Sequence, residues 1–398
     1  MRELQAQITA VRVTHGRYQH FFGYYDKCPW NASGRYLLAH RVAIPTRMLN
    51  ADDAATLGIV DLGAGFTFRA IGETTAWHWQ QGAMLQWWPG DPEYSVIYNV
   101  RTDEGFGAVI QDIRSRALRR LPRPVAAVSH DGRTALSINF SRLADERPGY
   151  GYVGVPDPWR DVWAPEEDGI YAMDLETGRS ELVISLARVR AFQPDGTMRD
   201  VKHWFNHLLF SPDDRRFIFL HRWRRPGGES TDAMHAVARH YTRMFTANPD
   251  GSGLFCLNDH EMTSHFDWRD PEHVLAFARR RGIGDAFYLF TDRSNEVTLV
   301  GARLLAHLGD GHCSYSPDRR WILSDTYPDR EQKRLLYVYD PHADRRVDLG
   351  TFFSEPSWPI PCRCDLHPRW SREGRHVCLD SSHEGSRQIY LMDVGRLA

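Results

Sequence analysis

The sequence predicts an all-β protein: a seven-bladed β-propeller whose blades are four-stranded antiparallel sheets. A strand–turn–strand unit recurs seven times along the chain, and most copies are followed by a third strand that ends in Asp. The composition, with 13 Trp, 16 Tyr and 19 Phe beside 31 Gly and 22 Pro, is typical of short strands and tight turns. The 398 residues therefore predict one domain over 1–398, with about 57 residues per blade.

The repeated unit places an apolar anchor residue directly before each turn. In chain order these anchors are Trp30, Trp87, Val128, Phe210, Trp268, Tyr315 and Trp370. The Ser-Pro-Asp-Gly-like turn after the anchor suits a hairpin, because Pro presets φ and the last turn position tolerates positive φ. In these turns the copies resemble the repeat of TolB-type propellers.

The last blade ends after its third strand, 390–393. The segment 9–14 precedes blade one, and we expect it to supply the missing fourth strand and close the ring. Two insertions interrupt the repeat. The first, 142–168 in blade three, is rich in Gly, Pro and aromatic residues and is predicted to be an ordered loop over one face. The second, 224–243 in blade four, includes a predicted short helix over 232–241.

Composition and charge exclude several classes of protein. A charged fraction of 25% with 12% aromatic residues is that of a packed globular protein. A net charge of −2 gives no excess of positive charge for binding nucleic acid. No apolar run approaches the ~20 residues that cross a bilayer. The N-terminus shows no secretory signal. The six Cys are not spaced like those of small disulfide-rich domains. We expect a cytoplasmic protein without nucleic-acid or membrane partners; a periplasmic or secreted protein that had lost its leader would begin in the same way.

Equivalent positions on the innermost strands of a propeller point at one site in the central channel. The residues three before each anchor are Lys27, Met84, Val125, His207, His265, His312 and His367, so four consecutive blades place a histidine there. The ends of the second strands would add a rim of imidazole and guanidinium groups: His40, Arg41, Asn99, Arg101, Arg142, His221, Arg222, Arg279 and Arg280. We interpret this set as a candidate site, although any one such histidine could instead pack and bond to backbone.

A candidate metal centre lies at the last two blades. His312 and His367 come from adjacent blades, and Cys362, Cys364 and Asp365 directly precede His367. Imidazole, thiolate and carboxylate groups bind zinc and similar divalent ions. The alternative is a pair of buried, reduced cysteines beside histidines that bond to protein groups. We expect no organic cofactor.

Residues 200–395 resemble the oligogalacturonate lyases, cytoplasmic seven-bladed propellers that cleave short pectic fragments by β-elimination. The segments 206–212, 219–222 and 238–245 are similar to three segments of that family. The resemblance implies the same fold and an acidic oligosaccharide as substrate.

The resemblance also implies site residues. In the family a His on one blade and a Gln-x-x-His-x-His-Pro run on the last blade bind manganese, so His312 and His367 carry over as ligands. Asp365 stands in place of the middle His and Cys362 in place of the Gln, a softer set that would suit zinc. Arg243 falls where the family's proposed base lies.

The chemistry of β-elimination gives each predicted residue a role. The C5 proton of a uronate is acidic only when a cation neutralises the adjacent carboxylate, and a base must then reach it. Arg243 is the candidate base by resemblance, but because the ordinary pKa of arginine is too high, His207 and His265 remain alternatives. His221 and Tyr241 are candidate acids, and the candidate substrate-binding residues are Lys27, Arg41, Arg222 and Trp87.

The sequence therefore predicts a lyase that acts on a uronate-containing glycan. Two alternatives stay open. One is a non-catalytic propeller that binds a glycan or a protein partner. The other is a glycoside hydrolase, which needs two carboxylates about 5–10 Å apart; the acids near the innermost strands are Asp26, Asp267, Asp325 and Asp365.

Overall fold

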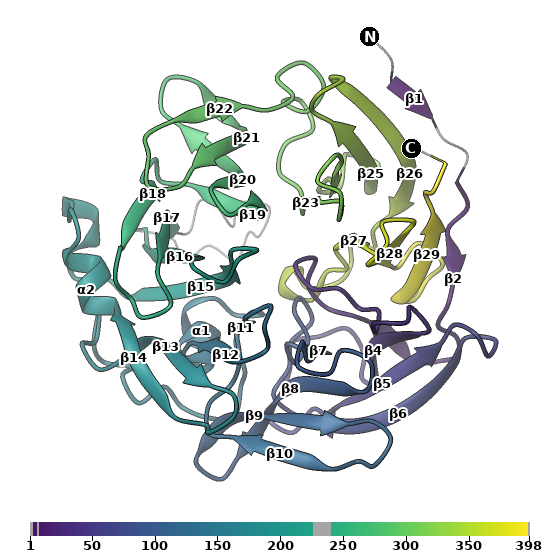
Figure 1. Cartoon of the computed structure of the whole chain (residues 1–398), viewed down its shortest axis with the longest axis horizontal. Coiled ribbons are helices and arrows are strands. Elements are labelled where there is room, and N and C mark those ends of the chain that lie inside the picture. Colours follow the sequence, from purple (N-terminus) through teal and green to yellow (C-terminus); the bar gives the residue numbers. More distant parts are fainter. Residues whose placement is uncertain (1–2, 6–7, 226–239, 397–398) are drawn as a thin grey trace.

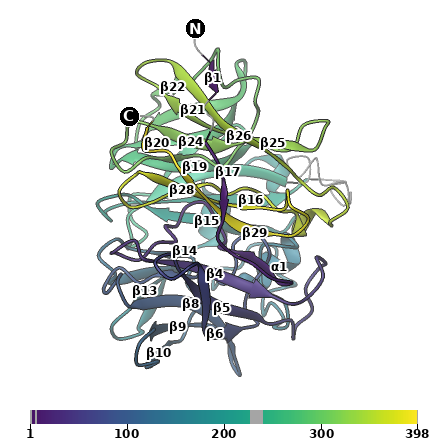
Figure 2. The same cartoon turned by 90° about the vertical axis from the view of Figure 1, so that its right-hand side faces the viewer.

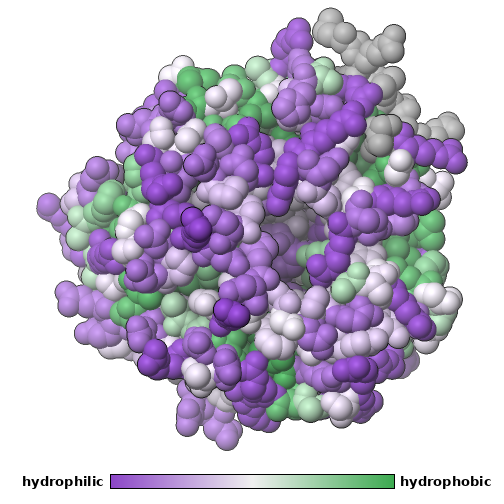
Figure 3. All heavy atoms as spheres, viewed as in Figure 1, coloured by the Kyte–Doolittle hydropathy of each residue, from purple (hydrophilic) through white to green (hydrophobic). Residues whose placement is uncertain are grey.

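The structure, a computed structural model, describes residues 3–5, 8–225 and 240–396. Over these residues the strands form seven sheets arranged radially around a central axis (Figure 1), so the predicted seven-bladed β-propeller is confirmed. The molecule is hollowed at its centre (Figure 3). Within the described ranges, no helix is long and apolar enough to span a membrane.

Each blade runs from an innermost to an outermost strand. The first three blades contain β3 (Gln19–Phe21), β4 (Tyr36–Val42), β5 (Ala55–Asp61) and β6 (Thr67–Thr74); β7 (Gln86–Trp87), β8 (Ser95–Thr102), β9 (Gly105–Asp112) and β10 (Leu118–Leu121); and β11 (Ala127–Val128), β12 (Thr134–Ser137), β13 (Gly169–Asp174) and β14 (Ser180–Ser185). Blades four and five contain β15 (His203–Phe210), β16 (Phe217–Arg224), β17 (His240–Ala247) and β18 (Phe255–Asn258); and β19 (Thr263–Asp270), β20 (His273–Arg280), β21 (Gly284–Thr291) and β22 (Val297–Leu299). The last two contain β23 (Ser314–Tyr315), β24 (Ile322–Asp325), β25 (Lys333–Asp340) and β26 (Arg345–Phe353); and β27 (Arg369–Trp370), β28 (His376–Ser381), β29 (Gln388–Asp393) and β2 (Val11–Arg12).

The N-terminal segment closes the ring as predicted. Strand β2 pairs antiparallel with β29, with Val11 opposite Leu391, and becomes the outermost strand of the last blade. The Thr14 hydroxyl donates to Gln388 Oε1 at 2.7 Å and accepts from the backbone N–H of Ile389 at 2.9 Å, which adds side-chain bonds to the junction. A further strand, β1 (Glu3–Gln5), runs parallel to β26 and adds a fifth strand to blade six.

The tryptophan anchors join neighbouring blades. The indole Nε1 of Trp87 donates to the carbonyl oxygen of Pro29 in blade one at 2.8 Å, and Trp268 Nε1 donates to Leu209 in blade four at 3.3 Å. Both side chains are buried. A large apolar ring with one polar N–H fills the space between two blades and satisfies a backbone oxygen there. This explains why the anchor position favours aromatic residues.

The turns after the anchors adopt the predicted conformation. Their last position has positive φ in five blades, at Gly34, Gly132, Asp214, Arg319 and Gly374. In blades three, four and six a serine hydroxyl bonds the aspartate two residues on, for example Ser211 Oγ to Asp213 Oδ1 at 2.7 Å. The repeated turn motif therefore has a local physical cause.

The blade-three insertion is ordered, as predicted, and it includes the helix α1 (Phe140–Glu146). Helix α1 lies toward one face of the disc (Figure 2). A second helix, α2 (Leu186–Ala191), follows β14. In blade four the predicted helix over 232–241 lies outside the described residues, except that His240 and Tyr241 belong to strand β17.

Several histidines are buried in the blades as neutral groups. Burial lowers the pKa of His20, His40 and His203 to about 4, and that of His78 to about 3. Their unfolded-state pKa is about 6.5. The unfolded chain therefore binds more protons than the folded protein below pH 6.5, and folding stability falls as the pH is lowered toward 4.

We expect each of His20, His40 and His203 to cost about 2 kcal/mol of unfolding free energy between pH 7.5 and pH 5. Urea unfolding at both pH values measures this loss. Replacing His20 with Gln is expected to make the pH dependence shallower, whereas replacing the exposed His15 with Gln leaves it unchanged. Equal unfolding free energies at the two pH values would contradict this account.

Candidate active site and metal centre

The first strand of blade one is interrupted, and the interruption places two tyrosines in the channel. Strand β3 ends at Phe21, and the innermost edge resumes only at Trp30, which forms a single bridge with Leu37. Gly23 lies in the intervening loop with φ of 138°, and a Cβ on it would lie 2.9 Å from the carbonyl oxygen of Gln81. The tight approach requires glycine.

The structure brings the four predicted channel histidines together around Tyr24. The centroid of the Tyr24 ring lies 4.9 Å from that of His207, 6.3 Å from His265, 6.0 Å from His312 and 5.0 Å from His367. The rings of His265 and His312 are 4.1 Å apart, and those of His312 and His367 are 4.4 Å apart. All five side chains are buried.

Two of these histidines have strained backbone. His207 has φ of 54° and His367 has φ of 40°, and Met84, at the corresponding position of blade two, also has φ of 54°. A non-glycine residue in this left-handed region costs of order 1–3 kcal/mol, which the surrounding structure must offset. The left-handed conformation therefore recurs at the same repeat position in three of the seven blades.

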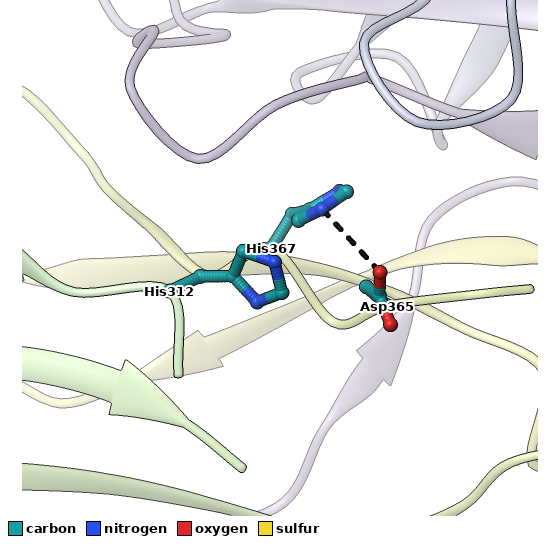
Figure 4. A group of neighbouring side chains, drawn as sticks. All are labelled: His312, Asp365 and His367. Atoms are coloured by element: carbon teal, nitrogen blue, oxygen red, sulfur yellow. Dashed lines mark ion pairs between the residues drawn. The ribbon is translucent and has the colours of Figure 1, made fainter. Parts of the chain in front are cut away.

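The group His312, Asp365 and His367 has the geometry of a metal centre (Figure 4). One ligand atom from each residue lies within 4.8 Å of the others. In the part of the chain that the structure describes, His312 Nε2 and His367 Nε2 are buried atoms without a hydrogen-bond partner, and Asp365 Oδ2, which pairs with Arg363, lies 3.9 Å from His367 Nε2. Unpaired buried polar atoms are costly, so their convergence fits a divalent cation.

The neighbours of His312 fix which nitrogen faces this group. His312 Nδ1 lies 2.8 Å from Oδ1 of Asp325, at the end of β24. The carboxylate accepts the Nδ1 proton and leaves the lone pair on Nε2, the arrangement common to histidines that bind metals.

Asp365 carries a negative charge that two arginines balance. Its carboxylate lies 2.6 Å from Arg334 Nη2 and 2.7 Å from Arg363 Nη2. Burial alone would raise the pKa of Asp365, but Arg363 and Arg334 outweigh it and hold that pKa well below its ordinary value. The group is therefore an ionised ligand in a positively charged setting.

His265 and His207 lie beside this group. His265 Nδ1 is 2.9 Å from Asp310 Oδ1. Burial lowers the pKa of His265, and Asp310 opposes that effect. His207 Nε2 is 3.5 Å from the Tyr25 hydroxyl and 4.0 Å from Asp26 Oδ2, and its ring stacks on Phe266.

The two cysteines predicted as ligands do not join the metal group found in the described residues. Cys362 Sγ lies 3.8 Å from Met48 Sδ, and Cys364 Sγ lies 3.9 Å from the carbonyl oxygen of Asp365. Burial raises the pKa of Cys362 to about 11 and that of Cys364 to about 12, so without a metal both thiols keep their protons. The metal group found in the described residues consists of imidazole and carboxylate groups, and thiolate ligands stay a prediction.

Arg243, His221 and Tyr241 lie on one face of the blade-four sheet, away from the channel histidines. Arg243 donates to the carbonyl oxygens of Val189 and Phe192, beside α2, and lies 3.3 Å from His221 Nδ1. Tyr241 stacks on Trp223. Outside the gap at 226–239, no hydrogen bond, ion pair or ring contact joins these three residues to His207, His265, His312 or His367. The structure therefore does not bring them together with the channel histidines, and their roles as base and acids stay predictions.

The predicted substrate-binding residues and the predicted cationic rim form only in part. Trp87, a predicted substrate-binding residue, is buried between blades, so it has no free face for a sugar ring. Arg41 packs over the rings of Tyr18 and Phe68. Arg142 is buried in an ion pair with Asp157. Arg279 forms an ion pair with Asp285, and Arg101 forms one with Asp52. These aspartates balance the two guanidinium charges.

Two of the predicted substrate-binding residues keep a position that suits the role. Lys27 lies 2.9 Å from Asp26, which in turn lies near His207. Arg222 is buried, and among the described residues its Nε and Nη1 have no hydrogen-bond partner.

Sequence reasoning missed the residues that surround the histidines from other strands. Tyr24, Asp310, Tyr327 and Arg363 all lie beside the group, and Tyr327 is exposed at 36%. These residues lie in loops outside the repeat, so no repeated sequence pattern marks them. The unusual run Gly23-Tyr-Tyr-Asp-Lys27 directly before the first anchor was the one available indication.

The fold and the histidine group define a β-propeller with a candidate metal centre in its channel. No protein-family model matches the chain, and no curated protein matches it in sequence. Solved structures match it in fold. An oligogalacturonate lyase from Vibrio parahaemolyticus has a TM-score of 0.64 at 15% identity, with 99% of this chain and 96% of that chain covered. An oligogalacturonate lyase in complex with manganese has a TM-score of 0.66 at 15% identity, with coverage of 98% and 94%.

These matches confirm the predicted resemblance in fold to oligogalacturonate lyases. The β-propeller domain of the Trilobed protease from Pyrococcus furiosus also matches, with a TM-score of 0.51 at 12% identity and coverage of 96% and 95%. Since propellers of different activities share the fold, function must be argued from the site.

Proposed function

We propose that this protein is a metal-dependent lyase that cleaves a uronate-containing oligosaccharide by β-elimination in its central channel. The observation that carries the proposal is the convergence of His312 Nε2, His367 Nε2 and Asp365 Oδ2 beside the His265–Asp310 pair. The match in fold to an oligogalacturonate lyase in complex with manganese supports it.

His312, Asp365 and His367 are the residues that would hold the divalent cation, manganese or zinc. The cation, when bound, supplies positive charge that neutralises the uronate carboxylate and makes the C5 proton more acidic. Arg363 and Arg334 bring two further positive charges within 2.7 Å of Asp365. The centre therefore favours an anionic sugar over a neutral one.

His265 is the base in this proposal. Asp310 accepts its Nδ1 proton, which leaves a lone pair on Nε2 and fixes the orientation of the ring. Its ring lies 4.1 Å from that of His312, so the base is next to the group that binds the carboxylate. In the elimination step Nε2 takes the C5 proton, the C5–H electron pair forms the C4–C5 double bond, and the C4–O4 bond breaks.

Tyr24 is the acid that protonates the departing O4. Burial raises the pKa of Tyr24 well above its ordinary value, so the phenol carries a proton to donate. The neighbouring Tyr25 does not suit this role, because its hydroxyl donates to Phe266 O at 3.0 Å and accepts from Phe266 N at 2.9 Å. Both rings pack against the histidines, but the Tyr25 hydroxyl is held by the backbone of Phe266.

The placement of the channel acids disfavours a glycoside hydrolase. Asp26 pairs with Lys27, Asp325 with His312, and Asp365 with two arginines. Asp267 accepts from the backbone N–H of Tyr315. Because each carboxylate already serves a protein partner, the described acids do not form a free pair for hydrolysis.

Absorbance near 235 nm tests the proposal, since β-elimination gives an unsaturated uronate. The protein is incubated, with added manganese or zinc, with oligomers of galacturonate, glucuronate, mannuronate and guluronate, and with a neutral glucan as control. We expect an absorbance rise with at least one acidic oligomer and none with the glucan. Reducing ends released without absorbance would indicate hydrolysis and contradict the lyase proposal.

A further inference from the structure

The blade-three insertion carries a positively charged group at the end of α1. Arg147 follows α1 directly, and its guanidinium carbon lies 3.9 Å from the centroid of the Tyr150 ring. Within residues 3–5, 8–225 and 240–396, no carboxylate forms an ion pair with Arg147 and no hydrogen bond to its guanidinium is found. Within these ranges, the Arg147 guanidinium therefore contacts an aromatic ring and has no anionic partner.

Arg147 is held near the metal group by the side chains between them. Its guanidinium lies over the ring of Tyr150, and the Tyr150 hydroxyl accepts from Arg363 Nη2 at 3.4 Å. Arg363 in turn lies 2.7 Å from Asp365. Two side chains therefore separate Arg147 from the carboxylate of the metal group.

The insertion that carries Arg147 is firmly anchored. Arg142, one turn earlier in α1, is 2% exposed. Its guanidinium donates to Asp157 Oδ2 and to the carbonyl oxygens of Trp159, Val162, Trp163 and His203. The last of these contacts ties the insertion to the first strand of blade four. Arg147 is therefore presented by a rigid support.

The tip of the insertion reaches across to the last blade. A Cβ on Gly149 would lie 2.3 Å from Cβ of Pro361, which places the two segments in direct contact. The Tyr150 hydroxyl accepts from Arg363 Nη2 at 3.4 Å, and Arg363 is the residue that pairs with Asp365. Arg363 also lies 5.4 Å from the Tyr327 ring. A continuous row of guanidinium and phenol groups thus runs from Arg147 to the metal group.

These groups match the chemistry of an anionic sugar. A guanidinium binds a carboxylate through two parallel hydrogen bonds. The ring of Tyr150 is buried and supports the Arg147 guanidinium from one side. We propose that Arg147, supported by Tyr150, forms a second carboxylate subsite, which binds the uronate next to the one that reacts. The inference rests on the proposed function, which supplies the anionic oligosaccharide, and it adds that the substrate carries charges on two adjacent residues.

Calorimetric binding of trigalacturonate and of its fully methyl-esterified form tests the subsite. We expect the wild-type protein to bind the free acid more tightly than the ester. Arg147→Gln is expected to weaken binding of the acid by about 10- to 100-fold, the usual effect of one charge-assisted contact, and to leave binding of the ester unchanged. Arg147→Lys, which keeps the charge but not the two-pronged geometry, is expected to fall between the two.

The matched control is Arg160→Gln, at an exposed arginine of the same insertion, which should bind as the wild type does. Unchanged binding of the acid by Arg147→Gln, or a wild-type protein that does not distinguish acid from ester, would overturn the subsite. The lyase proposal fails separately, if the bound acid gives no absorbance at 235 nm in the wild-type protein.

Discussion

Replacing His312 with Ala is expected to remove both the bound metal and the lyase activity. His312 offers Nε2 to the metal group, and Asp325 fixes that nitrogen as the one with the lone pair. With one of three protein ligands gone, we expect the metal content to fall to background and kcat/KM to fall about 10³-fold or more. Elemental analysis of the purified variant and the 235 nm assay measure the two effects.

Two further variants make this result specific. Asp325→Asn keeps the shape of the residue that orients His312, and it should lower metal affinity by about 10- to 100-fold without removing the site. His15→Ala, at an exposed histidine outside the channel, should change neither quantity. If His312→Ala kept full metal content and full activity, the centre would be misplaced.

Replacing His265 with Ala is expected to abolish elimination while metal binding is retained. His265 is the proposed base and lies beside the metal group without being one of its ligands. A positioned base contributes about 10²–10⁴-fold, so a loss of that size in kcat is expected with little change in KM. Asp310→Asn, which disturbs only the orientation of the ring, should give a smaller loss.

The control for this change lies on the same blade. His273 also pairs with an aspartate, Asp270, at 2.8 Å, but at the opposite end of the sheet. His273→Ala should therefore leave kcat unchanged. Activity of His265→Ala at the wild-type level would show that another group takes the C5 proton, with His207 as the next candidate.

Most of the fold could be predicted because its signals are local and repeated. Each anchor and turn is fixed by residues within a few positions, such as the hydroxyl of Ser211 that bonds Asp213. The closing strand was predictable since the last blade lacked a partner and the N-terminus offered one. The broken first strand of blade one was not, because it depends on Gly23 meeting Gln81 of the next blade.

The site was only half predictable for a similar reason. The four histidines occupy one repeat position, so the symmetry of the propeller brings them together. Arg243 and Tyr241 lie apart from this group because they share one face of β17: Arg243 bonds to the segment of α2, a helix outside the repeat, and Tyr241 stacks on Trp223. Tyr24 and Arg147 come from loops whose paths depend on tertiary contacts, which no local pattern records.

The most direct test of the account is the 235 nm assay on metal-free and metal-reloaded protein, with trigalacturonate as substrate. The account predicts no absorbance after treatment with a chelator, and recovery when manganese or zinc is added to the wild-type protein but not to His312→Ala. Elimination that continues at full rate in metal-free protein, or recovery in His312→Ala equal to that of the wild type, would contradict it.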